Sequence, residues 1–184
     1  MSAATYDVVY TESRNRVTTL FRYILAIPHL IVSAAWGYFA QILAVVQWFI
    51  VLFTGKRNRS IWGLQNDYVG YNTRVGSYVA LMYDSYPPFG TDVGATGVTY
   101  SLEFEESANR LTNALRLLWA IPAAFIAVFV SIGACFVVVV SWLAIVLSGK
   151  HPRGMFDFVL KALRFSVRLN TYAMLMTDTY PKFE

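Results

Sequence analysis

Few residues in this sequence have the types and spacings that catalysis or metal binding requires. The 184-residue chain has two histidines, His29 and His151, and one cysteine, Cys135. A metal site needs several His, Cys or carboxylate ligands at short spacings, and these three residues do not provide one. No glycine-rich phosphate loop, nucleophile elbow or His-x-x-x-His pair occurs either. We therefore expect no catalytic residue, no metal, no cofactor and no enzymatic activity.

The best polar candidates are an arginine and an aspartate that occur twice at the same spacing, as Arg74/Asp84 and as Arg168/Asp178. The pairing favours a salt bridge or a capped helix end that locks one helix to its neighbour. The alternative is that the arginine binds a lipid phosphate or a partner's carboxylate, both of which match the guanidinium fork. Each aspartate also begins an Asp-x-Tyr-Pro-x-Phe motif, which we expect to be structural and which comprises Asp84, Tyr86, Pro87 and Phe89, and Asp178, Tyr180, Pro181 and Phe183.

These candidates recur because the chain is an internal duplication. Residues 12–89 match residues 106–183 without a gap, and the matched positions include Arg, Asp, Gly and Pro as well as apolar residues. Chance similarity of two apolar stretches does not explain such matches. We divide the chain into a first repeat (1–89), a turn-rich linker (90–97) and a second repeat (98–184).

Composition indicates a membrane protein. Hydrophobic residues make up 57 % of the chain and charged residues only 14 %, against roughly 45–50 % and 25 % in soluble domains. No ionisable Asp, Glu, Lys or Arg occurs in residues 23–55 or 117–149. A bilayer core takes about 20 apolar residues per helix, so each stretch exceeds one span but is tight for two.

Three arrangements of each apolar stretch compete. One is a single long tilted helix, the second is a hairpin of two short spans, and the third is a hairpin that dips into the membrane without crossing it. We favour the hairpin, at about 17–54 and 111–148. The turns would lie near residues 35–38 and 130–133.

Each repeat has the same elements around its apolar stretch. Alternating residues at 6–10 and 98–104 predict β-strands, which could pair with each other. Ser13 and Ser107 are expected helix N-caps, and Gly55 and Gly149 are expected C-caps. A third, amphipathic helix follows at about 60–84 and 154–178, with Ile61, Leu64, Tyr68, Tyr71, Val75, Tyr78 and Met82 on one face of the first copy.

Basic residues flank both apolar stretches. We expect them to contact anionic lipid headgroups or a partner: Arg16, Arg22, Lys56 and Arg59 around the first stretch, and Arg110, Arg116, Lys150 and Arg153 around the second. Under the positive-inside rule, hairpins with basic residues at both ends place both termini in the cytoplasm. The prediction is a multi-pass protein of the bacterial plasma membrane, with two parallel copies about a pseudo-twofold axis. The net charge of +4 lies at the membrane segments, which argues against nucleic-acid binding.

The pattern Arg-x-x-x-x-x-Arg, Ile-Pro, Gly-Lys, Arg-x-x-x-Tyr and Asp-x-Tyr-Pro-x-Phe, present in both copies, resembles the membrane family called domain of unknown function 4389. Asp-x-Tyr-Pro-x-Phe is the most specific part of the match. The resemblance implies a bacterial, often actinobacterial, membrane protein with no established activity, so no catalytic residue carries over. The first copy has Gly55-Lys56-Arg57-Asn58 where the second has Gly149-Lys150-His151-Pro152, which departs from the family's Gly-x-x-Pro.

The expected fold class is therefore an all-α integral membrane protein of two tandem pseudo-symmetric units, each a membrane hairpin followed by an interfacial amphipathic helix and preceded by a short strand. The expected function is that of a non-enzymatic accessory or scaffold subunit, which packs against a larger membrane complex and anionic lipids. One alternative is a lipid-handling module with a cleft between the repeats, and another is a small transporter or channel. The absence of charge within the apolar stretches argues against ion pumping.

Overall fold

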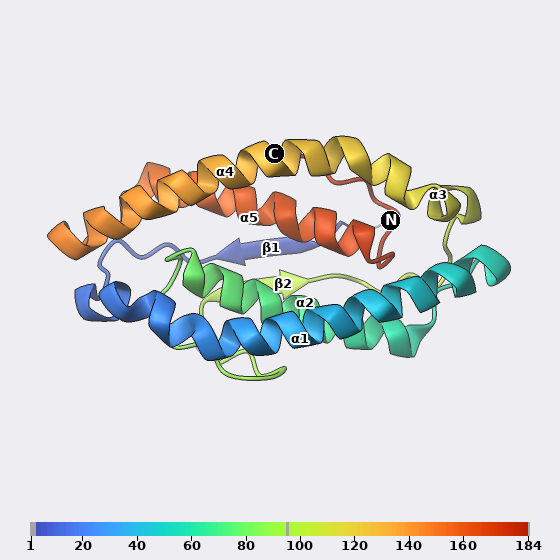
Figure 1. Ribbon diagram of the computed structural model, residues 1–184, viewed down its shortest axis with the longest axis horizontal. Helices are drawn as coiled ribbons and strands as arrows, with labels where there is room; N and C mark the ends of the chain where they lie inside the picture. Colours follow the sequence, from blue (N-terminus) through green and yellow to red (C-terminus); the bar gives the residue numbers. More distant parts are fainter. Residues whose placement is uncertain (1–2, 95, 184) are drawn as a thin grey trace.

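The computed structural model describes residues 3–94 and 96–183. Residues 1–2, 95 and 184, which belong to the expected first repeat, linker and second repeat, lie outside the described residues. Figure 1 shows a mostly helical molecule with one pair of short strands. In chain order the elements are β1 (Thr5–Val8), α1 (Arg16–Thr54), α2 (Arg59–Val79), β2 (Val98–Ser101), α3 (Arg110–Ala114), α4 (Arg116–Ser148) and α5 (Arg153–Ala173).

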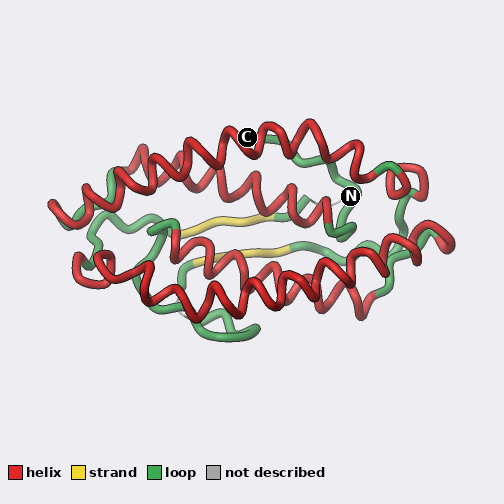
Figure 2. The backbone as a smooth tube through the Cα atoms, in the orientation of Figure 1, coloured by secondary structure: helices red, strands yellow, loops and turns green. Residues whose placement is uncertain are grey.

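The elements form three layers. The long helices α1 and α4 run antiparallel in one layer, α2 packs on α1, and α5 packs on α4 (Figures 1 and 2). The strands β1 and β2 contact α5 and α2 respectively, on the side away from α1 and α4. The hydrophobic core lies between the strands and α2 and α5, and it includes Tyr6, Val8, Val69 and Phe156.

The predicted hairpins are wrong, because each apolar stretch is helical throughout. α1 continues through residues 35–38, and α4 continues through residues 130–133. Gly37, which lay in the predicted turn, instead lets α1 approach the Tyr68 side chain on α2. Neither stretch contains a strong helix breaker at its middle, and the prolines inside the two helices, Pro28 and Pro122, each remove one backbone donor without ending the helix. A break occurs only near the start of the second copy, where Leu115 separates α3 from α4.

The N-caps of the apolar helical stretches differ from the predicted residues, whereas the C-caps agree with the prediction. Asn15 and Asn109, rather than Ser13 and Ser107, are the N-caps, and each side chain accepts hydrogen bonds from the first turn of its helix. Ser13 and Ser107 lie in backbone bridges to Lys150 and Lys56. The glycine C-caps are present as expected: Gly55 and Gly149 have φ of 73° and 75°, which glycine adopts without a steric penalty.

The second helix of each repeat is shorter than predicted. α2 ends at Val79 and α5 at Ala173, because Leu81 and Leu175 adopt left-handed φ values of 64° and 65° that stop a helix. These leucines are buried, so packing offsets the backbone strain. Most of the predicted face is buried, namely Tyr68, Tyr71, Val75, Tyr78 and Met82. Leu64 is the exception at 44 % exposed, and Gln65 is buried beside that face.

The two repeats exchange their strands. β1 pairs with β2 in antiparallel register, Tyr6 opposite Tyr100, and each strand packs on the second helix of the other repeat. Further links repeat symmetrically: the Trp48 indole donates to the Asn113 carbonyl, and the Trp142 indole donates to the Thr19 carbonyl. The repeats are therefore interlocked about a pseudo-twofold axis through the strand pair.

Candidate functional site

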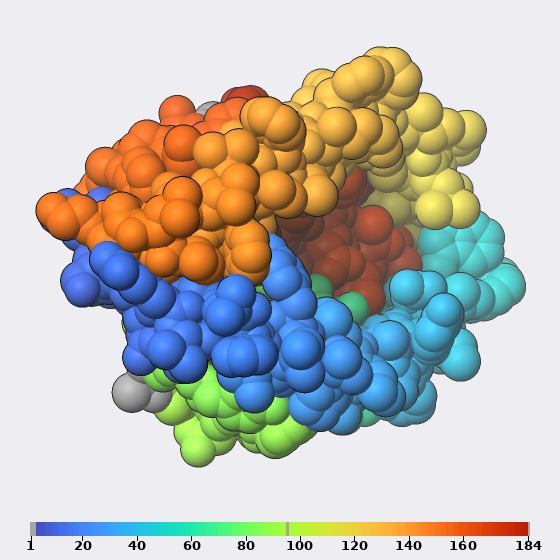
Figure 3. All heavy atoms as spheres, turned by 60° about the vertical axis from the view of Figure 1, so that its left-hand side comes forward, coloured from blue at the N-terminus to red at the C-terminus, as the bar shows by residue number. Residues whose placement is uncertain are grey.

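One face of the molecule is apolar over its whole length. α1 buries only a narrow stripe of mostly small residues against α2, which includes Ala26, Ser33, Gly37 and Ala40. Bulky side chains cover the rest of α1 and α4, and Figure 3 shows these two helices forming the near face. The most exposed of them include Ile24, Ile31, Tyr38, Ile42, Phe53, Leu117, Phe125, Ile132, Phe136 and Leu147. Both helices are long and apolar enough to cross a membrane.

Basic residues lie at both ends of this apolar face, as expected. Arg16 lies over Gly149 at the end of α4, and Arg110 lies over Gly55 at the end of α1. Positive charge at a helix C-terminus is favourable because the last carbonyl groups carry partial negative charge. The neighbouring lysines form exposed ion pairs: Lys150 with Glu12 at 3.1 Å and Lys56 with Glu106 at 3.0 Å.

The other predicted basic residues have different roles. Arg22 and Arg116 are fully or almost fully buried, so they do not reach lipid headgroups. Arg59 lies over the Phe104 ring. Arg153 lies over the Tyr10 ring and forms an exposed ion pair with Asp157 at 3.0 Å.

Asp84 joins the two helices of the first repeat, but through Arg22 rather than Arg74. Its carboxylate accepts from Arg22 Nη2 at 2.6 Å and from the backbone N–H of Asn15 at 2.8 Å. Arg22 also donates to the Tyr83 carbonyl and lies 4.7 Å from the centre of the Tyr78 ring. Asp84 therefore links the start of α1 to the segment after α2, and its ion-pair partner is Arg22 instead of the predicted Arg74.

Asp178 makes the equivalent junction in the second repeat with two arginines. Arg116 Nη2 lies 2.5 Å and Arg57 Nη2 lies 2.6 Å from the same carboxylate oxygen, and the backbone N–H of Asn109 reaches the other oxygen. Burial opposes the charged carboxylate, but Arg57, the Asn109 N–H and Arg116 outweigh it and hold the pKa of Asp178 below its usual range.

Each aspartate cluster contains one further arginine, but the two arginines come from positions that do not correspond in the internal repeat. In the Asp178 cluster Arg57 donates to the Leu175 carbonyl, and its counterpart in the Asp84 cluster is His151, which lies against the Leu81 backbone. In the Asp84 cluster the extra guanidinium is Arg14, which donates to the Met82 carbonyl; its counterpart is Ala108. Sequence reasoning did not place Arg14, Arg57 or His151 at these junctions, and the signal that could have done so is their departure from the internal repeat.

The Asp-x-Tyr-Pro-x-Phe motifs fold back onto the helices. In the first copy, Phe89 stacks on His29 with ring centres 4.0 Å apart, and Tyr86 lies 4.6 Å from the same ring. In the second copy Ala123 stands where His29 would be, and Tyr180 contacts Tyr172 while Phe183 contacts Phe165. Pro87 and Pro181 are buried.

Arg74 and Arg168 turn away from the aspartates with which the sequence paired them. Arg74 Nη2 donates to the Gly90 carbonyl at 2.6 Å, and Arg168 Nη1 donates to the Lys182 carbonyl at 3.1 Å. Each arginine thus holds the segment that follows its helix. Burial lowers the pKa of the Arg74 guanidinium from its usual value.

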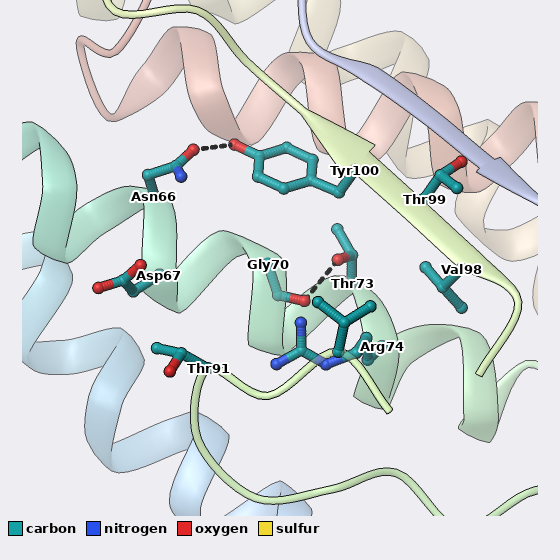
Figure 4. Close-up of a pocket in the computed structure, with 10 residues that line it drawn as sticks. Asn66, Asp67, Gly70, Thr73, Arg74, Thr91, Val98, Thr99 and Tyr100 are labelled. Atoms are coloured by element: carbon teal, nitrogen blue, oxygen red, sulfur yellow. Dashed lines mark hydrogen bonds between the residues drawn. The ribbon is translucent and has the colours of Figure 1, made fainter. Parts of the chain in front are cut away.

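Two hollows differ in character. An apolar one of about 390 Å³ lies between α1 and α4 and is bordered by Ala44, Trp48, Leu117 and Ala173; Figure 3 shows the C-terminal part of the chain at its floor. A polar one of about 340 Å³ lies between α2, β2 and the 90–97 segment (Figure 4). Among residues 3–94 and 96–183, no group of three or more His, Cys, Asp or Glu could hold a metal ion.

Comparison with known proteins gives a family but no described relative. Searches of curated proteins and of solved structures find no match to this chain. The model of one family, Domain of unknown function (DUF4389), matches residues 16–90 and again residues 110–184. These two matches coincide with the two helical repeats and leave out both strands. Because they cover well over half of the sequence, the chain belongs to the DUF4389 family and carries its domain twice.

Proposed function

We propose that the protein is a non-enzymatic membrane accessory or scaffold protein whose α1–α4 layer lies within one leaflet of a bilayer. The observation that carries this proposal is the apolar face: α1 and α4 expose bulky apolar side chains and no charge across residues 23–55 and 117–149. Soluble monomers rarely expose apolar patches beyond a few hundred Å². Lipid contact is the environment that stabilises such a face.

The length of the helices favours an in-plane position over a spanning one. α1 has 39 residues, which at about 1.5 Å per residue makes it about 58 Å long, against a hydrocarbon core of about 30 Å. Standing upright, it would need a steep tilt to bury its ends. Lying flat, its full apolar length contacts lipid.

The layers behind α1 and α4 support the same orientation. Asp67 on α2, Lys161 on α5 and Asp7 on β1 are exposed, and they lie on elements packed alongside the long helices. An upright molecule would carry these charges and the strand edges to membrane depth, where charged groups and unpaired backbone are costly. A flat molecule leaves them in water.

The basic residues are consistent with this position. Both ends of α1 carry positive charge, at Arg16 and at Lys56 and Arg59. Under the positive-inside rule both ends belong on the same side of the membrane, which one uninterrupted helix achieves by lying in the interface. We place the polar layer and both termini on the cytoplasmic side of a bacterial plasma membrane, with anionic lipids at Arg16 and Arg110.

The in-plane position can be tested first on the unmodified sequence, because its single cysteine accepts a spin label. Cys135 is exposed on α4, so a nitroxide attached there reports its depth through oxygen and nickel-chelate accessibility in liposomes. We expect a shallow depth, and the same depth for labels at Ile121→Cys, Phe129→Cys and Leu143→Cys in a Cys135→Ser background. These positions are exposed along the length of α4. A depth that passes through a maximum at the bilayer centre along the helix would instead indicate a spanning helix and overturn the in-plane proposal.

The accessory role has its own test. Affinity purification in a mild detergent should recover a partner membrane protein in constant stoichiometry, and the in-plane layer offers it a broad apolar flank. Repeated recovery of a lone chain would contradict the accessory role while leaving the membrane position intact.

A second candidate function, lipid handling, is favoured by the hollow between α1 and α4. This hollow lies between the two repeats, is lined mainly by apolar residues and opens on the lipid-facing side. We expect native mass spectrometry to detect one co-purified phospholipid that Ala44→Phe expels. The exposed Ala35→Phe serves as the control, because it adds the same bulk on α1 outside the hollow. Equal lipid retention by both variants would eliminate this candidate.

A further inference from the structure

The polar pocket beside β2 contains a buried cation that forms no close ion pair with any described residue. Arg74 is only 5 % exposed. One of its terminal nitrogens donates to the Gly90 carbonyl, and its Nε has no hydrogen-bond partner. Among the described residues no carboxylate lies within 4.0 Å of its guanidinium. Asp92 attracts this guanidinium only from beyond ion-pair distance. Burying a guanidinium without a carboxylate in contact is costly, so this site favours an anion.

The walls of the pocket offer complementary polar groups. Figure 4 shows the Arg74 guanidinium pointing toward Thr91, and Arg74 Nη1 lies beside Gly70 of α2, where both residues line the pocket. The Asn66 carbonyl oxygen accepts from the Tyr100 hydroxyl, which leaves the Asn66 amide N–H₂ and the Thr91 hydroxyl as donors to a ligand. Asp67 at the other end of the pocket can accept a hydrogen bond from the far end of that ligand.

The second repeat does not retain this pocket, although the fold is the same. The counterpart of Gly70 is Arg164, whose side chain reaches the strand packed on α5: it donates to the Tyr6 carbonyl and pairs with Asp7 at 2.9 Å. The counterparts of Asn66 and Thr73 are Leu160 and Val167. In the first repeat, Thr91 and Val93 close the pocket. The cavity is thus specific to the first copy, where a glycine replaces a long side chain.

We propose that this pocket binds a small oxyanion, a carboxylate or phosphate, with Arg74 as its anchor and Asn66 and Thr91 as further donors. A guanidinium forms paired, charge-assisted hydrogen bonds with either group. The pocket opens on the strand side of α2, away from the α1–α4 layer (Figure 4). The ligand is therefore a soluble molecule rather than a lipid of the leaflet in which α1 and α4 lie.

Calorimetric titration of the purified full chain in detergent tests the proposal with three probes: L-glutamate, succinate and inorganic phosphate. We expect saturable, one-site binding of at least one probe. Gly70→Arg should weaken that binding by about tenfold or more, because it rebuilds the side chain that fills the second repeat. Gly63→Arg is the matched control, since it adds the same charge to α2 at a position whose Cβ meets only open space.

Arg74→Gln is the second variant, with Arg168→Gln as its counterpart outside the pocket. We expect Arg74→Gln to weaken binding as strongly as Gly70→Arg does, and Arg168→Gln to leave it unchanged. Should Arg74→Gln fail to fold, the two glycine variants still decide the matter. The absence of saturable binding by all three probes, or equal affinity in Gly70→Arg and Gly63→Arg, would overturn the proposal, and either result would leave the membrane position of α1 and α4 untouched.

Discussion

At the scale of single residues, the two aspartate clusters make the same junction between helices with different sets of side chains. Each joins the start of a long helix to the end of the helix packed on it, through Arg22 in one case and Arg116 in the other. The Asp84 side chain is 28 % exposed with one ion pair, whereas the Asp178 side chain is 4 % exposed with two. A deeply buried carboxylate needs the second cation more, because it has lost more of its hydration.

Arg14 and Arg57 supply the further guanidinium of their clusters from different positions of the repeat. Substitutions that convert one arrangement into the other should therefore compensate each other in stability. Arg14→Ala should destabilise the protein by about 1–3 kcal/mol, since the buried Met82 carbonyl loses its donor. His151→Arg alone should also destabilise, because it places a second guanidinium beside Arg14. The double variant copies the Ala108/Arg57 arrangement of the other cluster, so we expect a favourable coupling of about 1–3 kcal/mol. Unfolding by SDS titration in mild micelles measures it, and simple additivity of the two losses would contradict the equivalence of the clusters.

His151 predicts a loss of stability in mild acid. Burial above all, and then Arg14 and Arg22, lower the pKa of His151 to about 4, although the Leu81 carbonyl and Asp84 act in the opposite sense. The unfolded chain therefore takes up a proton near pH 6.5 while the folded protein takes it up only near pH 4. Stability contributed by the neutral ring is complete above pH 6.5 and declines as the pH falls towards 4, by at most about 3 kcal/mol.

The measurement is the free energy of unfolding against pH for the wild type and for His151→Gln. His29 is present in both proteins, so the difference between the two curves reports His151 alone. We expect the wild-type curve to fall more steeply between pH 6.5 and 4. Parallel curves would mean that His151 is not held neutral by its surroundings.

At the scale of elements, close contact between α1 and α2 depends on a small residue in the middle of a long helix. A Cβ added at Gly37 would lie 2.8 Å from the Tyr68 hydroxyl, whereas one added at Gly63 on α2 meets nothing within 4 Å. The first glycine therefore serves packing, and the second only weakens its helix. Gly37, which the sequence pattern placed in a turn, therefore serves this close contact within an unbroken α1.

Two alanine variants should consequently move stability in opposite directions. Gly63→Ala should stabilise by about 0.5–1 kcal/mol through helix propensity. Gly37→Ala should destabilise by about 1–3 kcal/mol, because overpacking outweighs the same gain in propensity. Adding Tyr68→Phe to Gly37→Ala should recover most of that loss, since it removes the clashing oxygen. Thermal unfolding in detergent separates the variants, and a stabilising Gly37→Ala would show that α1 and α2 do not pack this closely.

At the scale of the whole molecule, the exchanged strands make the two repeats one folding unit. β1 packs on α5, β2 packs on α2, and backbone hydrogen bonds join residues 12–14 to 149–151 and residues 55–57 to 106–108. Neither repeat can complete its core alone, because the strand that covers its second helix belongs to the other repeat.

Splitting the chain in the 90–97 segment tests this interlocking. Fragments 1–92 and 93–184, expressed separately in membranes, should be aggregated or protease-sensitive, whereas co-expression should yield a stable complex that a tag on either fragment recovers. Protease resistance and a monodisperse elution profile are the readouts. A single fragment that is resistant and monodisperse on its own would contradict the interlocked architecture.

Much of the local structure was predictable because it depends on residues close together in the sequence. The internal duplication, the glycine C-caps and the helical character of 59–79 and 153–173 follow from matched residues and spacing. The junction aspartates were also identified, since Asp84 and Asp178 recur in a motif. Their partners were not, because helix spacing cannot tell whether Arg74 or Arg22 approaches Asp84 after the chain reverses.

The sequence by itself determined that two uncharged apolar stretches recur in a duplicated chain, because hydropathy and repetition are properties of residue order. Only the tertiary structure decided that each stretch is one helix, since the alternatives satisfy the same hydropathy and differ in what packs behind them. It also decided which chemistry the chain offers. The aspartates of the repeated motif and their arginines join helices. Arg74, a buried cation with no carboxylate in contact among the described residues, lies where a glycine and a strand from the other repeat leave space.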